Sequence, residues 1–342
     1  MRALAGLHVP KILVRPPNWI GDAVMNTPAL GALRTAFPSS EIVLAANPAV
    51  CELLSPHPFC DRVIVYDKKG SHKGIGGFWK FCRLIARERF DLAVLFQNAI
   101  EAAIIARLAG IKRRAGYGTD GRSILLTHAV RVSKETRRLH QSQYFLRMLS
   151  GLGIPPAEQV LRLQCTDEEK RSARGLLGQG PWVAINPGAA YGSAKRWSPE
   201  RFSQVADALA SDFGYKALLV GGPGETAIGS AIEAGMRSKA FNMVGRTSVR
   251  QLMALLASVD LVVTNDSGPM HVAAAFDRPI VALFGPTDHC TTSPLCSRFL
   301  MVRKDVECAP CLKRQCPTDH RCMADITVDD VVGAVGALLA GS

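Results

Sequence analysis

Residues 257–290 constrain the fold more than any other stretch of this chain. The apolar run 259–264 is rich in β-branched residues and predicts a buried parallel strand. The polar turn 265–269 ends that run, residues 270–276 predict a short helix, and residues 280–284 predict the next buried strand. Strand, turn, helix and strand in this order predict a βαβ unit. Its helix begins at the carboxyl end of a parallel strand, which is where open α/β sheets bind ligands.

The turn inside this unit is a candidate anion-binding site. Asp266 or Ser267 suits the N-cap position, with Pro269 in the first helical turn. Backbone N–H groups at a helix N-terminus lack intrahelical partners, and the helix dipole favours negative charge there. His271 either contacts a ligand or braces the turn, and the polar surroundings favour ligand contact. The alternative for the whole stretch is an ordinary, well-capped connection between strand and helix.

Other polar loops in the second half of the chain are expected at the same sheet edge. Three predicted strands end in glycine-containing loops, at Gly188, at Gly221-Gly222 and at Gly268. Because the carboxyl ends of parallel strands share one edge, we expect Lys195, Glu225 and the turn 266–271 to lie together. Lys195 would neutralise phosphate charge and Glu225 would accept hydrogen bonds from ribose hydroxyls, which suits a nucleoside diphosphate. The chain has no GxxxxGK[ST] loop and no N-terminal GxGxxG, which argues against a P-loop NTPase and a dinucleotide dehydrogenase.

The first half of the chain also alternates between predicted strands and helices, and it predicts a doubly wound α/β domain. Residues 11–15 predict its first strand, and Pro16-Pro17 prevents a helix from following at once. Residues 23–36 predict a helix, so Asp22 lies at or beside its N-terminus, where an ionised carboxylate is favoured. Asp22 is either the N-cap or a base at the mouth of a cleft, and one residue can serve as both.

The net charge of +12 lies entirely in the first half of the chain. Residues 1–155 hold 22 lysines and arginines against 10 aspartates and glutamates, whereas the remainder holds 19 of each. A basic half indicates an anionic partner, such as a nucleic acid, an anionic lipid or a phosphorylated glycan; the alternative is a solvated surface that aids solubility. An aromatic content of 6% and the lack of a recognised binding motif argue against a nucleic acid.

Length and linker composition predict two domains. A chain of 342 residues exceeds the usual size of a single core, and a proline-containing segment near residue 155 suggests a linker. The expected parts are a basic N-terminal, acceptor-binding domain (1–155), a linker and helix (156–180), a nucleotide-sugar-binding domain (181–326) and a C-terminal helix (327–342). No run of about 20 apolar residues occurs, and the ten cysteines do not form a disulfide framework, so we expect a cytoplasmic protein.

Four cysteines near the C-terminus form a compact cluster, Cys308-x2-Cys311-x4-Cys316-x5-Cys322, with His320 inside it. Thiolates at this density suit structural zinc. The spacing differs from the usual pair of C-x2-C motifs, however, and two prolines interrupt the cluster. Free thiols are therefore the favoured interpretation, and no metal site is predicted.

Several segments in both halves of the chain together resemble the family 9 glycosyltransferases. They are RPPNWIGDAVMNTPAL near the start of the chain, PG-x6-KRW before residues 257–290, and NDSGPMH and RPIVALFGPTD within those residues. The likeness covers nearly the whole chain, with the motifs in the same order. Within this family the chain is most similar to the ADP-heptose:lipopolysaccharide heptosyltransferases. The PPNWIGD segment and the late cysteines favour the heptosyltransferase II group.

The resemblance implies a GT-B fold, with two Rossmann-like doubly wound domains facing across a cleft and the last helix packing back towards the N-terminal domain. It implies inverting, metal-independent transfer of L-glycero-D-manno-heptose from ADP-heptose, without a cofactor, to heptosyl-Kdo2-lipid A of the lipopolysaccharide inner core. The alternatives are heptosyltransferase I activity on Kdo2-lipid A and a GT-B transferase that uses another nucleotide sugar. The implied partners are the nucleotide sugar and an anionic lipopolysaccharide precursor at the inner face of the cytoplasmic membrane. The protein would be monomeric, peripheral to the inner membrane, and would bind no nucleic acid.

The resemblance also implies roles for individual residues. Asp22 matches the general base, Lys195 the lysine that contacts phosphate, and Glu225 the acidic residue near the nucleoside. The donor-binding turn is matched by Asp266, Ser267, Gly268 and His271, and Thr247 falls where the family lines the adenine pocket. For the anionic acceptor, the basic first half offers Arg122 as our first choice, followed by Lys68, Lys69 and Lys73.

Overall fold

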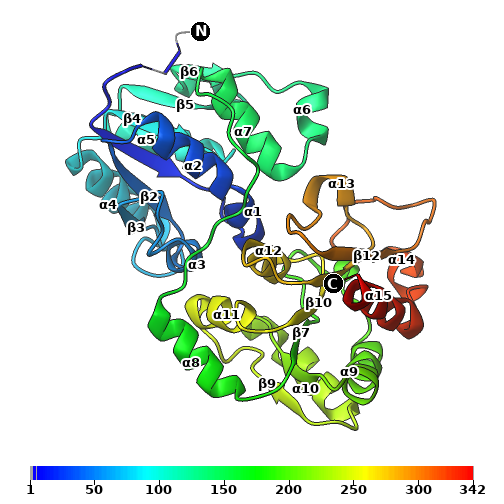
Figure 1. The fold of residues 1–342 in the computed structure, drawn as a ribbon. Helices are drawn as coiled ribbons and strands as arrows, with labels where there is room; N and C mark the ends of the chain where they lie inside the picture. The colour runs from blue at the N-terminus through cyan, green and yellow to red at the C-terminus, as the bar shows by residue number, and fades with distance from the viewer. Residues whose placement is uncertain (1–2, 5, 342) are drawn as a thin grey trace. The chain divides into compact units, whose positions relative to one another are not determined.

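The computed structural model of the protein describes residues 3–4 and 6–341, so residues 1, 2, 5 and 342 of the expected terminal segments lie outside it. The chain divides into two compact units, the first ending at Gln164 and the second beginning at Cys165 (Figure 1). Each unit contains one six-stranded sheet flanked by helices, and every strand pair is parallel. The expectation of two doubly wound α/β domains is confirmed.

The sheet of the first unit has the strand order β3-β2-β1-β4-β5-β6. Its strands are β1 (Lys11–Arg15), β2 (Glu41–Ala46), β3 (Arg62–Val65), β4 (Leu92–Leu95), β5 (Arg113–Tyr117) and β6 (His128–Val130). The chain runs from β1 outwards to β3, returns to form β4 beside β1, and then runs outwards to β6. The strand order therefore reverses between β1 and β4, and a crevice opens at such a reversal, outside the carboxyl ends of the strands.

The helices of the first unit differ from the sequence prediction at one point. They are α1 (Ile20–Met25), α2 (Thr27–Ala36), α3 (Pro48–Leu53), α4 (Gly74–Arg87), α5 (Ile100–Leu108), the 3₁₀ turn η1 (Arg122–Leu125), α6 (Lys134–Arg138) and α7 (Gln141–Gly151). The single helix predicted over residues 23–36 is wrong, because α1 begins at Ile20 and the chain breaks at Asn26. Pro28 explains the break: its ring would clash with the Val24 carbonyl in a continuous helix, and it has no N–H to donate.

The sheet of the second unit has the strand order β12-β11-β10-β7-β8-β9. Its strands are β7 (Trp182–Asn186), β8 (Lys216–Leu219), β9 (Ala240–Asn242), β10 (Leu261–Asn265), β11 (Ile280–Phe284) and β12 (Phe299–Arg303). Here the order reverses between β7 and β10. The predicted βαβ unit of residues 257–290 supplies β10 and β11, with residues of both strands fully buried.

The helices of the second unit complete the doubly wound arrangement. They are α8 (Asp167–Leu177), η2 (Ser193–Lys195), α9 (Pro199–Phe213), η3 (Pro223–Glu225), α10 (Thr226–Gly235), α11 (Val249–Leu256), α12 (Gly268–Ala275), α13 (His289–Thr292), α14 (Arg321–Ala324) and α15 (Val328–Ala340). Capping boxes begin α8, α11 and α15. In the described part of the chain, no helix combines the length and the apolar character needed to cross a membrane.

The unit boundary falls inside the segment 156–180 that the sequence suggests as linker and helix. Residues up to Gln164 belong to the first unit, where the Arg162 N–H donates to the Thr27 hydroxyl (3.0 Å), and α8 belongs to the second unit. The last helix, α15, contacts α9, β11 and β12. It buries Val331, Val335 and Leu338 in the core of the second unit. The expected packing of this helix towards the first domain stays a prediction.

An ion pair joins α8 to α11 and generates a pH-dependent prediction. Arg250 Nε and Nη2 lie 2.7 and 2.5 Å from Glu169 Oε1 and Oε2, and hydrogen bonding to this guanidinium lowers the Glu169 pKa from 4.5 to about 2. Glu169→Gln removes the charge but keeps a side-chain oxygen for the capping box with Thr166. At pH 7 we expect the free energy of unfolding of the second unit to fall by about 1–2 kcal/mol.

The pH dependence has a defined sign. Because the folded-state pKa of Glu169 is depressed, the stabilisation is present above the unfolded-state pKa and is lost as pH falls from about 5 towards 2. Urea unfolding of the wild type and the Gln variant should therefore converge over this pH range. A difference between them that stays constant from pH 7 to pH 2 would contradict the assignment of the stabilisation to this carboxylate.

Candidate active site

Lys195 and the turn 266–268, both predicted to bind the donor, lie where the strand order of the second unit reverses. Lys195, in η2, follows β7, and the turn 266–268 follows β10, the direct neighbour of β7. Thr264 of β10 pairs with Asn186 of β7, so the two strands end side by side (Figure 1). The residues expected to bind a nucleotide sugar thus occupy the position that open α/β sheets use for ligands.

A buried ion pair fixes the end of β10. Lys195 Nζ lies 2.7 Å from Asp266 Oδ2 and 3.3 Å from the Asp266 carbonyl oxygen, and the two side chains are only 12% and 4% exposed. The Thr287 hydroxyl, from the loop after β11, donates to the same carboxylate oxygen (2.6 Å). A lysine ammonium has three N–H donors, so two contacts to Asp266 leave one for a ligand. Asp266 therefore holds Lys195 at the sheet edge.

The start of α12 is open to an anion. Of the two expected N-cap residues, Ser267 takes the position, but its side chain makes no capping hydrogen bond. Asn186 Nδ2 instead donates to Ser267 Oγ (2.6 Å) and to Thr264 Oγ1 (2.9 Å). Because the Ser267 side chain does not cap α12, the positive end of the helix dipole faces the edge where Lys195 lies. His271, in the first turn, is buried, and its contact with a ligand stays a prediction.

Glu225 lies at the same edge of the second sheet, where its carboxylate closely approaches Gly188 in the loop after β7. Glu225 Oε2 accepts a hydrogen bond from the Gly222 N–H (2.8 Å). A Cβ atom on Gly188 would lie 2.0 Å from Glu225 Oε1, so a larger residue at this position would require the Glu225 carboxylate to move. Thr247 follows β9, the outer neighbour of β8, and is partly exposed. The loops after β7 and β8 thus meet, as the sequence predicts.

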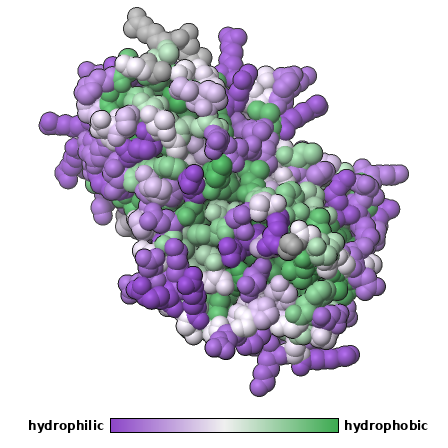
Figure 2. Space-filling view, viewed as in Figure 1, coloured by the Kyte–Doolittle hydropathy of each residue, from purple (hydrophilic) through white to green (hydrophobic). Residues whose placement is uncertain are grey.

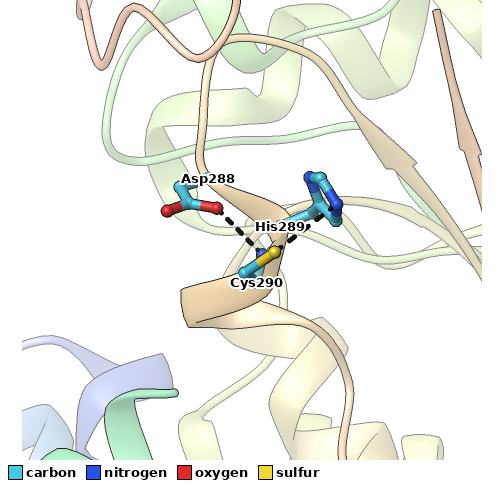
Figure 3. Close-up of side chains that lie close together, drawn as sticks. All are labelled: Asp288, His289 and Cys290. Atoms are coloured by element: carbon cyan, nitrogen blue, oxygen red, sulfur yellow. Dashed lines mark hydrogen bonds between the residues drawn. The ribbon is translucent and has the colours of Figure 1, made fainter. Parts of the chain in front are cut away.

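Three potential metal ligands that the sequence analysis did not single out follow β11. Asp288 is the N-cap of α13, and its Oδ1 accepts from the Cys290 N–H (3.0 Å), while Cys290 Sγ lies 3.7 Å from His289 Nε2 (Figure 3). One ligand atom from each of the three lies within 4.8 Å of the others. Within the described residues, the late cysteine cluster forms no group this tight. The expectation that the protein has no metal site stays a prediction.

Asp22 lies in the first turn of α1, directly after β1, and is partly exposed. The N-cap of α1 is Trp19, so Asp22 does not occupy the capping position that the sequence offered as one of its roles. A carboxylate in the first turn is favoured in its ionised form by the helix dipole. The position after β1, beside the strand-order reversal of the first sheet, leaves the role of base as the prediction for Asp22.

Arg122 is not a surface residue, so our first choice for contact with an anionic acceptor is wrong. Its side chain is 0% exposed. Its guanidinium donates to the carbonyl oxygens of Tyr117 (2.8 Å), Gln97 and Leu95 (3.3 Å) and to Asn98 Oδ1 (3.1 Å). Burial lowers the Arg122 pKa to about 10. Arg122 thus supplies donors to main-chain oxygens where β4 and β5 end.

The sequence analysis missed a second buried arginine, Arg15, at the carboxyl end of β1. Its Nη2 donates to Gln97 Oε1 (3.2 Å), and its guanidinium lies 5.2 and 5.7 Å from the ring centroids of Tyr66 and Phe81. Burial lowers its pKa to about 10. The available signal was a cation at the carboxyl end of a strand whose three central residues are apolar, since the residues that follow such a strand enter the crevice.

The three lysines expected to contact the acceptor lie on the loop between β3 and α4, and all are exposed. Lys68 Nζ lies 2.5 Å from Glu101 Oε2, and Glu101 Oε1 accepts from the Tyr66 hydroxyl (2.8 Å). This network anchors the loop to α5. Among the residues that the structure describes, Lys69 and Lys73 form no ion pair, so both remain available to an anionic ligand.

Two doubly wound units, with polar loops gathered at each strand-order reversal, define the GT-B class of glycosyltransferases. A model of the family described as Glycosyltransferase family 9 (heptosyltransferase) matches residues 78–321. The chain belongs to this family, which confirms the resemblance seen in the sequence.

The relatives agree with this assignment. The chain is 31% identical to lipopolysaccharide heptosyltransferase 2 of Escherichia coli K12, over 96% of this chain and 98% of the relative. The solved structure of E. coli ADP-heptose lps heptosyltransferase II matches with a TM-score of 0.83 and 28% identity, over 97% of this chain and 99% of that one. A family 9 glycosyltransferase structure from Veillonella parvula matches with a TM-score of 0.87 and 25% identity, over 97% and 98% of the two chains.

The burial of Arg122 predicts a structural phenotype. Arg122→Ala leaves three backbone carbonyls and the Asn98 amide oxygen without their donor, so we expect the free energy of unfolding of the first unit to fall by about 3–5 kcal/mol. The matched control is Arg138→Ala at the exposed end of α6, which should change it by less than about 0.5 kcal/mol. Chemical denaturation measures both; equal effects would show that Arg122 is not a structural residue.

Proposed function

We propose that this chain transfers L-glycero-D-manno-heptose from ADP-heptose to heptosyl-Kdo2-lipid A of the lipopolysaccharide inner core, with inversion at the anomeric carbon. The observation that carries the proposal is Lys195, held by Asp266 beside the uncapped start of α12. This arrangement suits a diphosphate. The similarity to a heptosyltransferase 2 along nearly the whole chain supports heptose as the sugar and the heptosylated core as the acceptor.

The donor lies, on this proposal, along the carboxyl edge of the second sheet. Its diphosphate faces the first turn of α12 and the remaining N–H donor of Lys195, with His271 in the same turn. Glu225 accepts hydrogen bonds from the ribose hydroxyls, and Thr247 lies near the adenine. Lys195 follows β7 and α12 follows β10, whereas Glu225 follows β8 and Thr247 follows β9. The residues proposed for the phosphates, the ribose and the base therefore lie in that order along the sheet edge.

The proposed chemistry is a single displacement. Asp22 takes the proton from an acceptor hydroxyl as its oxygen attacks the anomeric carbon, and the bond between that carbon and the β-phosphate oxygen breaks. The transition state has oxocarbenium character, as at other glycosidic centres. Negative charge develops on the leaving ADP, where Lys195 and the α12 N-terminus stabilise it. Because these groups supply positive charge, the proposed reaction needs no metal ion.

The acceptor is proposed to bind the first unit, whose net charge is positive. Lys69 and Lys73, with Lys68 on the same loop, would contact the phosphate and carboxylate groups of the lipopolysaccharide precursor. Such a precursor is anchored in lipid, so the protein would work as a monomer at the inner face of the cytoplasmic membrane, peripheral to it.

The proposal is tested by incubating the protein with ADP-heptose and either Kdo2-lipid A or its mono-heptosylated form, followed by mass spectrometry of the lipid. We expect only the mono-heptosylated acceptor to gain a heptose. Gain by Kdo2-lipid A alone would show heptosyltransferase I activity. Turnover of another nucleotide sugar in place of ADP-heptose would assign a different donor.

The same assay tests Asp22. Asp22→Asn should lower the transfer rate by about two to four powers of ten, because general-base assistance is lost, while ADP affinity stays unchanged. Asp120→Asn makes the same substitution at an exposed position of the same unit, and its positive φ of 52° suits asparagine. This control should keep the wild-type rate. A near-normal rate for Asp22→Asn, with ADP binding intact, would remove Asp22 from the mechanism.

A further inference from the structure

Helix α4 has one buried face and one exposed face of unusual composition. Phe81, Cys82 and Ile85 pack into the core of the first unit. The outer face of α4 consists of the exposed side chains on the opposite side of the helix, Trp79, Lys80, Arg83, Leu84 and Arg87. These five side chains, with His72 and Gly76, line a surface hollow of about 760 Å³.

The outer face exposes large apolar side chains. Trp79 is 48% exposed and Leu84 is 36% exposed, and Ile75, one turn before Trp79, is 80% exposed. Single exposed apolar residues are normal on a protein surface. Here, however, a tryptophan and two aliphatic side chains are exposed on one helix of 14 residues.

The outer face is also basic without nearby compensation. Lys80, Arg83 and Arg87 form no ion pair in the described part of the chain, and α4 contains no acidic residue. The next acidic residue, Glu88, is already bound by Lys11 (2.7 Å) and Arg62. Hydrophilic side chains project on the left of Figure 2, where Figure 1 shows α4. The net charge of +12 carried by residues 1–155 adds a long-range attraction to anionic surfaces.

We infer that the outer face of α4 docks on an anionic phospholipid membrane. Tryptophan and long basic side chains beside aliphatic ones are the composition of helices that lie in the membrane interface, because the aromatic ring sits at the headgroup level and the cations bind lipid phosphates. Trp79 and Leu84 enter the interface, and Lys80, Arg83 and Arg87 contact the headgroups. The inference rests on the proposed function in one respect, since a lipid-anchored acceptor places the enzyme at such a surface.

Sedimentation with acceptor-free vesicles tests this surface. We expect the full-length wild type to bind phosphatidylcholine vesicles that contain about one third phosphatidylglycerol and not to bind pure phosphatidylcholine. Arg83→Gln/Arg87→Gln should weaken binding about 30-fold, the effect of losing two basic residues at an anionic surface. The matched control, Arg131→Gln/Lys134→Gln, removes the same charge beyond β6, at the sheet edge opposite β3, and should bind within about twofold of the wild type.

A second readout follows Trp79 directly. Brominated lipids in the anionic vesicles should quench part of the tryptophan fluorescence of the bound protein, and Trp79→Phe should lose that quenching. Failure of the wild type to bind, equal weakening by the control pair, or binding only when the acceptor is added would overturn the inference; the last result would assign the surface to the acceptor. Because the vesicles contain neither donor nor acceptor, failure of the proposed transfer reaction leaves this result unchanged.

Discussion

The ion pair between Lys195 and Asp266 is the interaction on which the proposed donor site depends. It joins the loop after β7 to the end of β10, and the Thr287 hydroxyl adds the loop after β11 to the same carboxylate. A buried ion pair contributes little net stability, because the desolvation of both charges offsets their attraction. The ion pair instead fixes the place of a cation: it holds the Lys195 ammonium group, largely out of water, beside the N-terminus of α12. Electrostatic stabilisation of a leaving diphosphate is strongest in such a place.

In the first unit, two buried arginines hold the ends of the central strands. Arg122 donates to the carbonyl groups where β4 and β5 end, and Arg15 lies at the end of β1 against Tyr66 and Gln97. These buried cations support the ends of the strands around the strand-order reversal, and Asp22 lies in the first turn of α1, the helix that follows β1. Rigid support of this kind matters because a base contributes only when it is held within hydrogen-bond reach of the proton it removes.

Much of the fold could be predicted from local sequence. The βαβ unit of residues 257–290 could be predicted because two buried β-branched runs flank a polar turn, and the glycine-containing loops indicated the edge proposed for ligand binding. The break between α1 and α2 was also encoded locally, in Pro28, and was overlooked. Long-range contacts were not readable. Arg122 lies in a turn-rich segment that suggests exposure, whereas three of the four oxygen atoms that accept from it belong to residues 95–98, more than 20 residues away. The choice of Ser267 as N-cap likewise depends on Asn186 and Lys195, which belong to another strand and its loop.

The central claim is that the Lys195–Asp266 pair and the start of α12 form a diphosphate site. A crystal structure of the protein with ADP tests it most directly. The account predicts that β-phosphate oxygens lie within hydrogen-bond distance of Lys195 Nζ and of backbone N–H groups in the first turn of α12, with the ribose near Glu225. A diphosphate bound away from α12, for example on the basic loop before α4, would contradict it.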